Sequence, residues 1–251
     1  MAVYDVNGNV ISIDGFISAR GVNPVFFGNQ LIAHKGGNAG TANTISNFQT
    51  AINNGYKMVE CDVRFTSDDV AVLSHDASFT VGGVTYTIAT NTYATLIAAK
   101  PDLATLWDLL ILCKNNGVVV EVDFSKTYTN HQCDLLYSLL TKSNMALSAM
   151  ITSYATPIRY LLSINPDLIV CVSAVTTEAG VDAVSDIFDT AIWAGVSTEY
   201  NGSFQQSFVE YIHSKGGFSK PWTVNSAATI GTLFNYGVDY IITDSVKPSD
   251  L

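Results

Sequence analysis

Four carboxylates interrupt two apolar runs of the sequence at the same spacing. Glu60 and Asp62 lie two residues apart in MVECDV, and Glu121 and Asp123 are spaced alike in VVVEVDF. Alternate residues of a strand share a face, so each pair would point to one side. Carboxylates in such apolar surroundings are costly to bury and repel one another. A divalent cation relieves both costs, and an oxygen-only donor set favours Mg²⁺ or Ca²⁺ over zinc.

Two histidines lie close to the same runs. His34 ends LIAH, and His75 follows VAVLS. An imidazole with an ordinary pKa of about 6.5 suits a general acid or base near neutrality. Asp76, directly after His75, either orients that imidazole or caps the following loop. His131 and His213 lie on polar helix faces, so we interpret both as surface residues.

Short, β-branched apolar runs recur along the whole chain and predict the elements that would position these groups. Eight candidate strands fall at residues 31–34, 58–63, 118–124, 149–154, 168–174, 191–197, 217–224 and 240–244. Most segments between them have helical apolar spacing, several with Thr or Ser at the start and Gly at the end. This α/β alternation predicts a (β/α)8 TIM barrel; a doubly wound open sheet is the structural competitor. In a barrel the carboxyl ends of the strands meet at one face, where active sites lie.

Two segments do not fit the alternation. Residues 1–30 contain DVNGNVISIDG, which predicts a hairpin with its turn at Asn7 and Gly8. We expect this N-terminal extension either to plug the barrel floor or to join residues 31–251, the barrel domain, to something upstream. Residues 64–100 predict a small insertion of extra strands after the second barrel strand.

Composition narrows the range of partners. With 12 basic and 22 acidic residues the formal net charge is −10, which disfavours non-specific binding to nucleic acid or anionic lipid. The apolar content of 48% supports a large core, and no apolar run is long enough to span a bilayer. The first residues lack the pattern of a signal peptide, so we expect a cytoplasmic protein or a fragment of an extracellular one. We interpret four scattered cysteines and two tryptophans as core residues, with the thiols reduced: Cys61, Cys113, Cys133, Cys171, Trp107 and Trp193.

The segment IAHKGGNAGTANTISNFQTAINNGYKMVECDVRFTSDDVAVLSHD resembles the N-terminal signature of glycerophosphodiester phosphodiesterases. Near the other end, PWTVNSAATIGTLFNYGVDYIITD resembles the closing elements of that family. The resemblance extends over roughly residues 31–247 and consists of several ordered motifs.

The resemblance implies metal-dependent hydrolysis of glycerophosphodiesters to glycerol 3-phosphate and an alcohol. Glu60, Asp62 and Glu121 would bind one divalent cation, Mg²⁺ or Ca²⁺, and His34 and His75 would be the acid–base pair. The attacking group is water or the glycerol hydroxyl of the substrate itself, which would give a cyclic phosphate first. The cation would offset negative charge as phosphorus becomes five-coordinate.

The sequence also departs from the family pattern. Lys35 stands where an arginine is usual, and Asp123 stands where the family places a lysine that faces the phosphate. Asp123 could be an additional metal ligand, and the missing positive charge could come from Lys126, Lys220 or Arg64. We favour Lys220 because it shares a strand face with Trp222. Lys35, Lys220 and Trp222 are therefore the expected phosphate and substrate contacts.

Two alternative functions remain open from the sequence. The same chemistry could belong to a module of a larger extracellular or phage-tail protein that cleaves glycerol-phosphate polymers such as teichoic acid. The substitution at Asp123 also allows a non-catalytic barrel that binds phosphate or carbohydrate. The alcohol leaving group, the choice of cation, the roles of the two histidines and the oligomeric state are not indicated.

Overall fold

The computed structural model describes residues 3–4, 10–11, 26, 30–125, 128–201 and 204–251. Its central sheet contains eight parallel strands in the order β12-β11-β10-β9-β8-β4-β3-β13. The strands are β3 (Gln30–Ala33), β4 (Met58–Phe65), β8 (Val119–Asp123), β9 (Ala149–Ser153), β10 (Ile169–Ser173), β11 (Trp193–Glu199), β12 (Phe218–Trp222) and β13 (Tyr240–Thr243). At the seam, the Val224 N–H beyond β12 donates to the Ile242 carbonyl of β13 at 2.9 Å. The predicted TIM barrel and all eight of its strands are confirmed.

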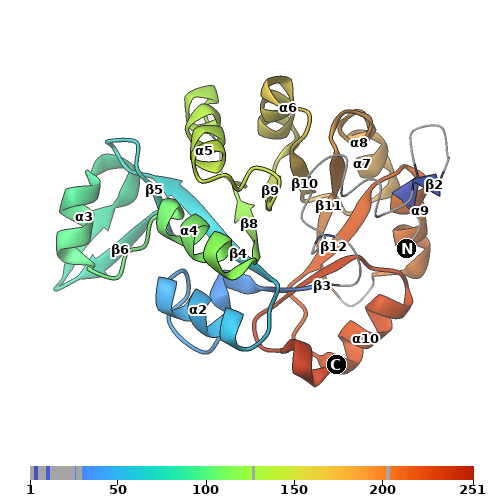
Figure 1. Cartoon of the computed structure of the whole chain (residues 1–251), viewed down its shortest axis with the longest axis horizontal. Coiled ribbons are helices and arrows are strands. Elements are labelled where there is room, and N and C mark those ends of the chain that lie inside the picture. Colours follow the sequence, from blue (N-terminus) through green and yellow to red (C-terminus); the bar gives the residue numbers. More distant parts are fainter. Residues whose placement is uncertain (1–2, 5–9, 12–25, 27–29, 126–127, 202–203) are drawn as a thin grey trace.

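Helices follow the strands and surround the barrel (Figure 1). They are α2 (Ile45–Asn53), α4 (Leu106–Asn116), α5 (Asn130–Lys142), α6 (Ala155–Ile164), α7 (Glu178–Asp182), α8 (Ser185–Thr190), α9 (Gln206–Ser214) and α10 (Ala227–Asn235). Thr105 and Asp108 form a capping box at the start of α4, and Gly117 ends it with φ 63°. The helical segment between β10 and β11 is divided into α7 and α8 at Val184, which has ψ 11° and a buried side chain.

The predicted insertion after the second barrel strand is present. The strand β5 (Ala71–Leu73) pairs antiparallel with the end of β4, and β6 (Ser78–Val81) and β7 (Val84–Thr87) form a separate hairpin. A helix that the sequence analysis did not predict, α3 (Tyr93–Ala99), completes the insertion, which projects from one side of the barrel (Figure 1). The insertion positions His75, because that residue follows β5.

Two short strands of the N-terminal extension, β1 (Val3–Tyr4) and β2 (Val10–Ile11), pair antiparallel. The turn expected at Asn7 and Gly8 lies outside the described residues, and the proposed roles of the extension stay predictions. Phe26 is buried among the inward-facing residues at the amino ends of the strands, where its carbonyl accepts a hydrogen bond from the Tyr240 hydroxyl.

The barrel interior is layered because inward and outward side chains alternate along each strand. The lower layer is apolar and includes Met58, Val119, Met150, Ile169 and Phe218. Two residues further along each strand lies the next inward layer. There β4 and β8 turn Glu60 and Glu121 inward, and β12 turns Lys220 inward. The charged site therefore lies directly on an apolar floor, which excludes water from beneath it.

The outward faces of the strands pack against the helices in a large apolar core that contains Val59, Cys61, Val120 and Val122. The four cysteines are free and buried, as expected. Trp107 is 40% exposed, so its assignment to the core is wrong. Trp193 is partly buried at the barrel floor, and its indole N–H donates to the Tyr240 hydroxyl at 3.2 Å. Within the described ranges, every helix is too short or too polar to cross a membrane.

Candidate active site

A pocket of about 290 Å³ opens at the carboxyl ends of the strands. Every residue named above as a candidate ligand, acid–base group or phosphate contact lines it: His34, Lys35, Glu60, Asp62, His75, Glu121, Asp123, Lys220 and Trp222. The fold therefore brings these nine residues together at one end of the barrel. Arg64 does not line this pocket; its guanidinium donates to the His75 carbonyl at 2.6 and 3.0 Å. Lys126 lies outside the described residues.

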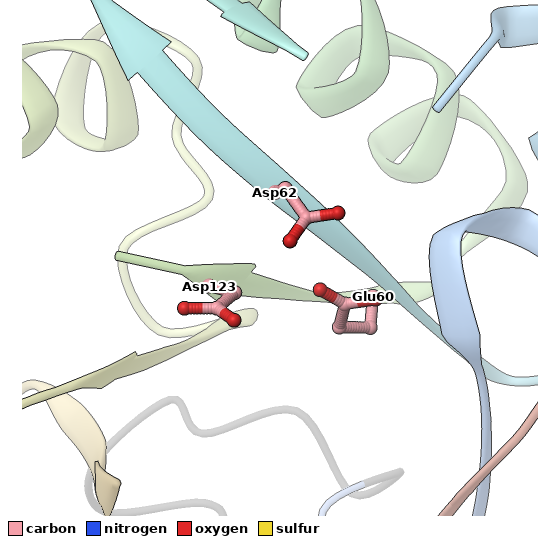
Figure 2. A group of neighbouring side chains, drawn as sticks. All are labelled: Glu60, Asp62 and Asp123. Atoms are coloured by element: carbon pink, nitrogen blue, oxygen red, sulfur yellow. The ribbon is translucent and has the colours of Figure 1, made fainter. Parts of the chain in front are cut away.

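The parallel pairing of β4 with β8 gathers the carboxylates. In this register Glu60 lies opposite Glu121, and Asp62 lies opposite Asp123. Among the described residues, oxygens of Glu60, Asp62 and Asp123 all lie within 4.8 Å of one another and could hold a metal ion. Figure 2 shows these three side chains side by side, two from β4 and one from β8. Asp123, expected only as an additional ligand, thus belongs to the most compact group.

Glu121 is held differently from the other three carboxylates. Its Oε1 accepts hydrogen bonds from the Lys220 ammonium and, at 2.7 Å, from the Thr152 hydroxyl. Its Oε2 is buried and has no hydrogen-bond partner among the described residues. A buried carboxylate oxygen without a donor is costly and marks a position where a cation would fit. The role of Glu121 as a ligand stays a prediction that this free oxygen supports.

Backbone and amide groups orient the other ligands. The Lys35 N–H donates to Glu60 Oε2 at 2.8 Å, because Lys35 has φ 54° in the short turn His34–Gly36. The Asn43 amide donates to Asp62 Oδ2 at 2.8 Å, and Asn43 Oδ1 accepts from the Asp62 N–H at 3.2 Å. The sequence did not single out Asn43 or Thr152, although Asn43 lies within the segment that resembles the family signature.

The electrostatic environment favours a cation. Burial, followed by repulsion from Asp62, Asp123 and Glu121, raises the pKa of Glu60 well above its usual value. Burial likewise raises the pKa of Asp123, and repulsion from Asp62 and Glu121 adds to it, although hydrogen bonds from Ser125 oppose the shift. The Lys35 ammonium, 3.8 Å from Asp62 Oδ2, compensates only part of this charge. The donor set therefore fits a hard divalent ion.

Each candidate catalytic imidazole is paired through Nδ1 with an aspartate. His34 Nδ1 lies 2.7 Å from Asp244 Oδ1, and His75 Nδ1 lies 2.9 Å from Asp76 Oδ1. Because an ionised carboxylate can only accept a hydrogen bond, these pairs favour the tautomer with the proton on Nδ1 and leave Nε2 for chemistry. His34 Nε2 lies 4.0 Å from Glu60 Oε2, next to the carboxylate group. His75 is more exposed, at 54% of its side chain.

The two aspartates remain ionised near neutrality. Burial raises the pKa of Asp244, but hydrogen bonds from Asn225 and His34 outweigh it, so the pKa falls below the usual value. The hydrogen bond from His75 lowers the pKa of Asp76. Both pairs therefore keep a fixed negative charge behind an imidazole, an arrangement suited to accepting and returning a proton.

Comparisons with known proteins identify a related family. The family model for the glycerophosphoryl diester phosphodiesterase family matches residues 34–247. In a comparison with curated proteins, nothing matches the chain.

Three solved structures illustrate the shared fold. A glycerophosphodiester phosphodiesterase of Parabacteroides distasonis is 20% identical with a TM-score of 0.71, and the match covers 87% of this chain and 93% of that one. An Oleispira antarctica phosphodiesterase, solved with the product sn-glycerol-3-phosphate, is 18% identical with a TM-score of 0.75, covering 86% and 92%. A Thermotoga maritima glycerophosphodiester phosphodiesterase is 20% identical with a TM-score of 0.67, covering 85% and 93%.

Proposed function

Because the chain belongs to the glycerophosphoryl diester phosphodiesterase family, we propose that it cleaves small glycerophosphodiesters with one divalent cation and two histidines. The membership confirms the resemblance found in the sequence and the expected enzyme class, a phosphoric diester hydrolase. The observation that carries the proposal is the pocket itself, which two aspartate-paired imidazoles line together with one group of carboxylates.

Glu60, Asp62 and Asp123, with the free oxygen of Glu121, would hold Mg²⁺ or Ca²⁺. When bound, the cation would offset the negative charge that develops on the phosphate oxygens during substitution at phosphorus. Lys35, whose ammonium lies 3.8 Å from Asp62 Oδ2, and Lys220, whose ammonium contacts Glu121, provide further positive charge. Trp222, 37% exposed at the end of β12, offers a flat apolar surface to the rest of the substrate.

The histidines would move the protons. One Nε2 takes a proton from the attacking hydroxyl while the new phosphorus–oxygen bond forms. The other Nε2 gives a proton to the alcohol oxygen as its bond to phosphorus breaks. Attack by water gives glycerol 3-phosphate and the alcohol directly, whereas attack by the glycerol hydroxyl of the substrate gives a cyclic phosphate that water then opens to glycerol 3-phosphate. His34 lies beside the carboxylates and His75 lies at the exposed mouth. We infer from these positions that His34 acts on the attacking group and His75 on the leaving group.

The proposal is tested by assaying release of glycerol 3-phosphate from glycerophosphocholine and related diesters, with and without a chelator. We expect cation-dependent release, and we expect His34→Ala and His75→Ala each to lower the rate by about 10² to 10⁴-fold. Circular dichroism and cation titration of both variants control for folding and for the cation site.

Full activity in the presence of chelator, or full activity of either histidine variant, would refute the proposed chemistry. Cleavage of a glycerol-phosphate polymer, without cleavage of the small diesters, would instead support teichoic acid as the substrate. Binding of diesters without any cleavage would support the non-catalytic alternative.

A further inference from the structure

Lys220 is a buried lysine in the interior of the barrel. It is 1% exposed, its ammonium contacts Glu121 Oε1, and the β12 segment that carries it is packed over the apolar floor. A buried ammonium is costly unless it has a defined electrostatic partner.

Lys220 contacts only one of the two carboxylate oxygens of Glu121. The ammonium and the Thr152 hydroxyl both bind Oε1, while Oε2 is buried without a partner. Glu121 lies opposite Glu60 in the register of β4 with β8 and lines the same pocket as Asp123, so its charge acts on the same group. Lys220 therefore fixes one oxygen of Glu121 and leaves the other for a cation.

The formal charges of the pocket lining give Lys220 a second role. Four carboxylates (Glu60, Asp62, Glu121 and Asp123) and two lysines (Lys35 and Lys220) line it, which leaves two negative charges, as many as one divalent cation balances. Without Lys220 the lining would hold one negative charge more than such an ion balances. The acidic residue Asp123 on β8 and the basic residue Lys220 on β12 line the same pocket and are thus electrostatically complementary.

We propose that Lys220 is a built-in counter-ion of the cation site, which holds Glu121 by one oxygen and compensates the charge that Asp123 adds. The inference rests on the cation site of the proposed function. Lys220 here is a positioning residue that acts through Glu121 and Asp123. It lets the barrel fold before a cation binds and weakens the affinity for that cation.

The test uses Lys220→Met, a substitution that keeps an unbranched side chain and removes the charge. Binding of Mg²⁺ and of Ca²⁺, each alone, is measured by isothermal titration calorimetry, and the thermal unfolding midpoint is measured with and without each ion. We expect Lys220→Met to unfold at a lower temperature without cation. We also expect it to bind the cation at least ten-fold more tightly than the unsubstituted protein, because a repelling charge has been removed.

A second variant tests the complementarity of the two positions. Asp123→Asn in the Lys220→Met background removes the surplus negative charge, so the unfolding midpoint without cation should recover. Lys215→Met is the matched control, because Lys215 pairs with Asp182 on the surface, at 2.6 Å, and does not line the pocket. It should change neither the cation affinity nor the response of the midpoint to cation.

Cation affinity of Lys220→Met equal to or weaker than that of the unsubstituted protein would overturn the inference, as would a midpoint that Asp123→Asn does not restore. If Lys220→Met fails to fold without cation, recovery by cation or by Asp123→Asn supports the inference, and failure of both overturns it. No readout depends on hydrolysis. A protein that binds the cation as described but cleaves no diester would refute the proposed function alone.

Discussion

His34 and Asp244 are 210 residues apart in the chain, yet Nδ1 of the imidazole lies 2.7 Å from Oδ1 of the carboxylate. The pairing of β13 with β3 brings them together, because Thr243 lies opposite Ala33 in the register. Asp244 is itself held by the Asn225 amide, which donates to Oδ2 at 2.7 Å. The closing strand of the barrel thus orients a candidate catalytic group of the first strand.

Asp244→Asn should lower turnover because the amide cannot act as an ionised acceptor for the His34 proton. A misoriented imidazole or the wrong tautomer costs about 10²-fold or more in rate. We expect the fall mainly in kcat, with KM little changed, in an assay of glycerol 3-phosphate release. The matched variant is Asp76→Asn at the exposed His75 pair, where a smaller loss is expected. Equal kcat for Asp244→Asn and the unsubstituted protein would contradict an orienting role.

Asp123→Lys should retain cation binding. Glu60, Asp62 and the free oxygen of Glu121 would still offer three carboxylates, and the new lysine would restore the residue that the family usually has there. Calorimetric titration with Mg²⁺ and Ca²⁺ checks this, and weaker but measurable binding is expected. Glu60→Gln is the comparison, since it removes the carboxylate that the Lys35 N–H orients. Complete loss of cation uptake in Asp123→Lys would show that Asp123 is indispensable.

His213 should make the stability of the protein depend on pH. Its Nε2 lies 2.8 Å from Oδ2 of the buried Asp239, and this hydrogen bond raises the pKa of His213 above 6.5, although burial opposes the shift. Because the pKa is raised in the folded state, the protonated imidazole contributes its full stabilisation below pH 6.5. This contribution to the free energy of unfolding is lost as the pH rises through the folded-state pKa. Because the imidazole is 39% exposed, solvent screening reduces the effect.

Urea unfolding of His213→Asn and of the unsubstituted protein at pH 5.5 and pH 8.5 measures this contribution. The two proteins should differ more in their free energy of unfolding at the lower pH. His131→Asn provides the control, since its partner Asp69 is exposed and the pair lies on the surface. A stability difference for His213→Asn that is the same at both pH values would rule out the charged pair.

Gly195→Ala should destabilise the barrel floor. A Cβ at Gly195 would lie 2.2 Å from the Phe218 carbonyl oxygen and 2.3 Å from its ring, closer than atoms can approach. Overpacking of this kind costs about 1 to 3 kcal/mol, more where the backbone cannot move. Chemical denaturation checks the loss. Gly231→Ala is the control, because no atom lies within 4 Å of a Cβ there.

The sequence by itself determined the barrel and the groups at its carboxyl end. Alternating strand and helix patterns fix the parallel order, and the two-residue spacing of Glu60 with Asp62, and of Glu121 with Asp123, turns each pair inward. His34 and His75 stood out beside these runs, and the family motifs assigned them the acid–base role. These features are local in the chain, so local pattern sufficed to find them.

Only the tertiary structure decided which of the site residues contact one another. The register of β4 with β8 places Asp123 within 4.8 Å of Glu60 and Asp62. Glu121 instead pairs with Lys220, a residue 99 positions away. The pairing of His34 with Asp244, and the burial of Lys220, likewise depend on strands that meet only when the barrel closes. Distances between residues far apart in the chain follow from strand register and side-chain packing, which no local pattern encodes.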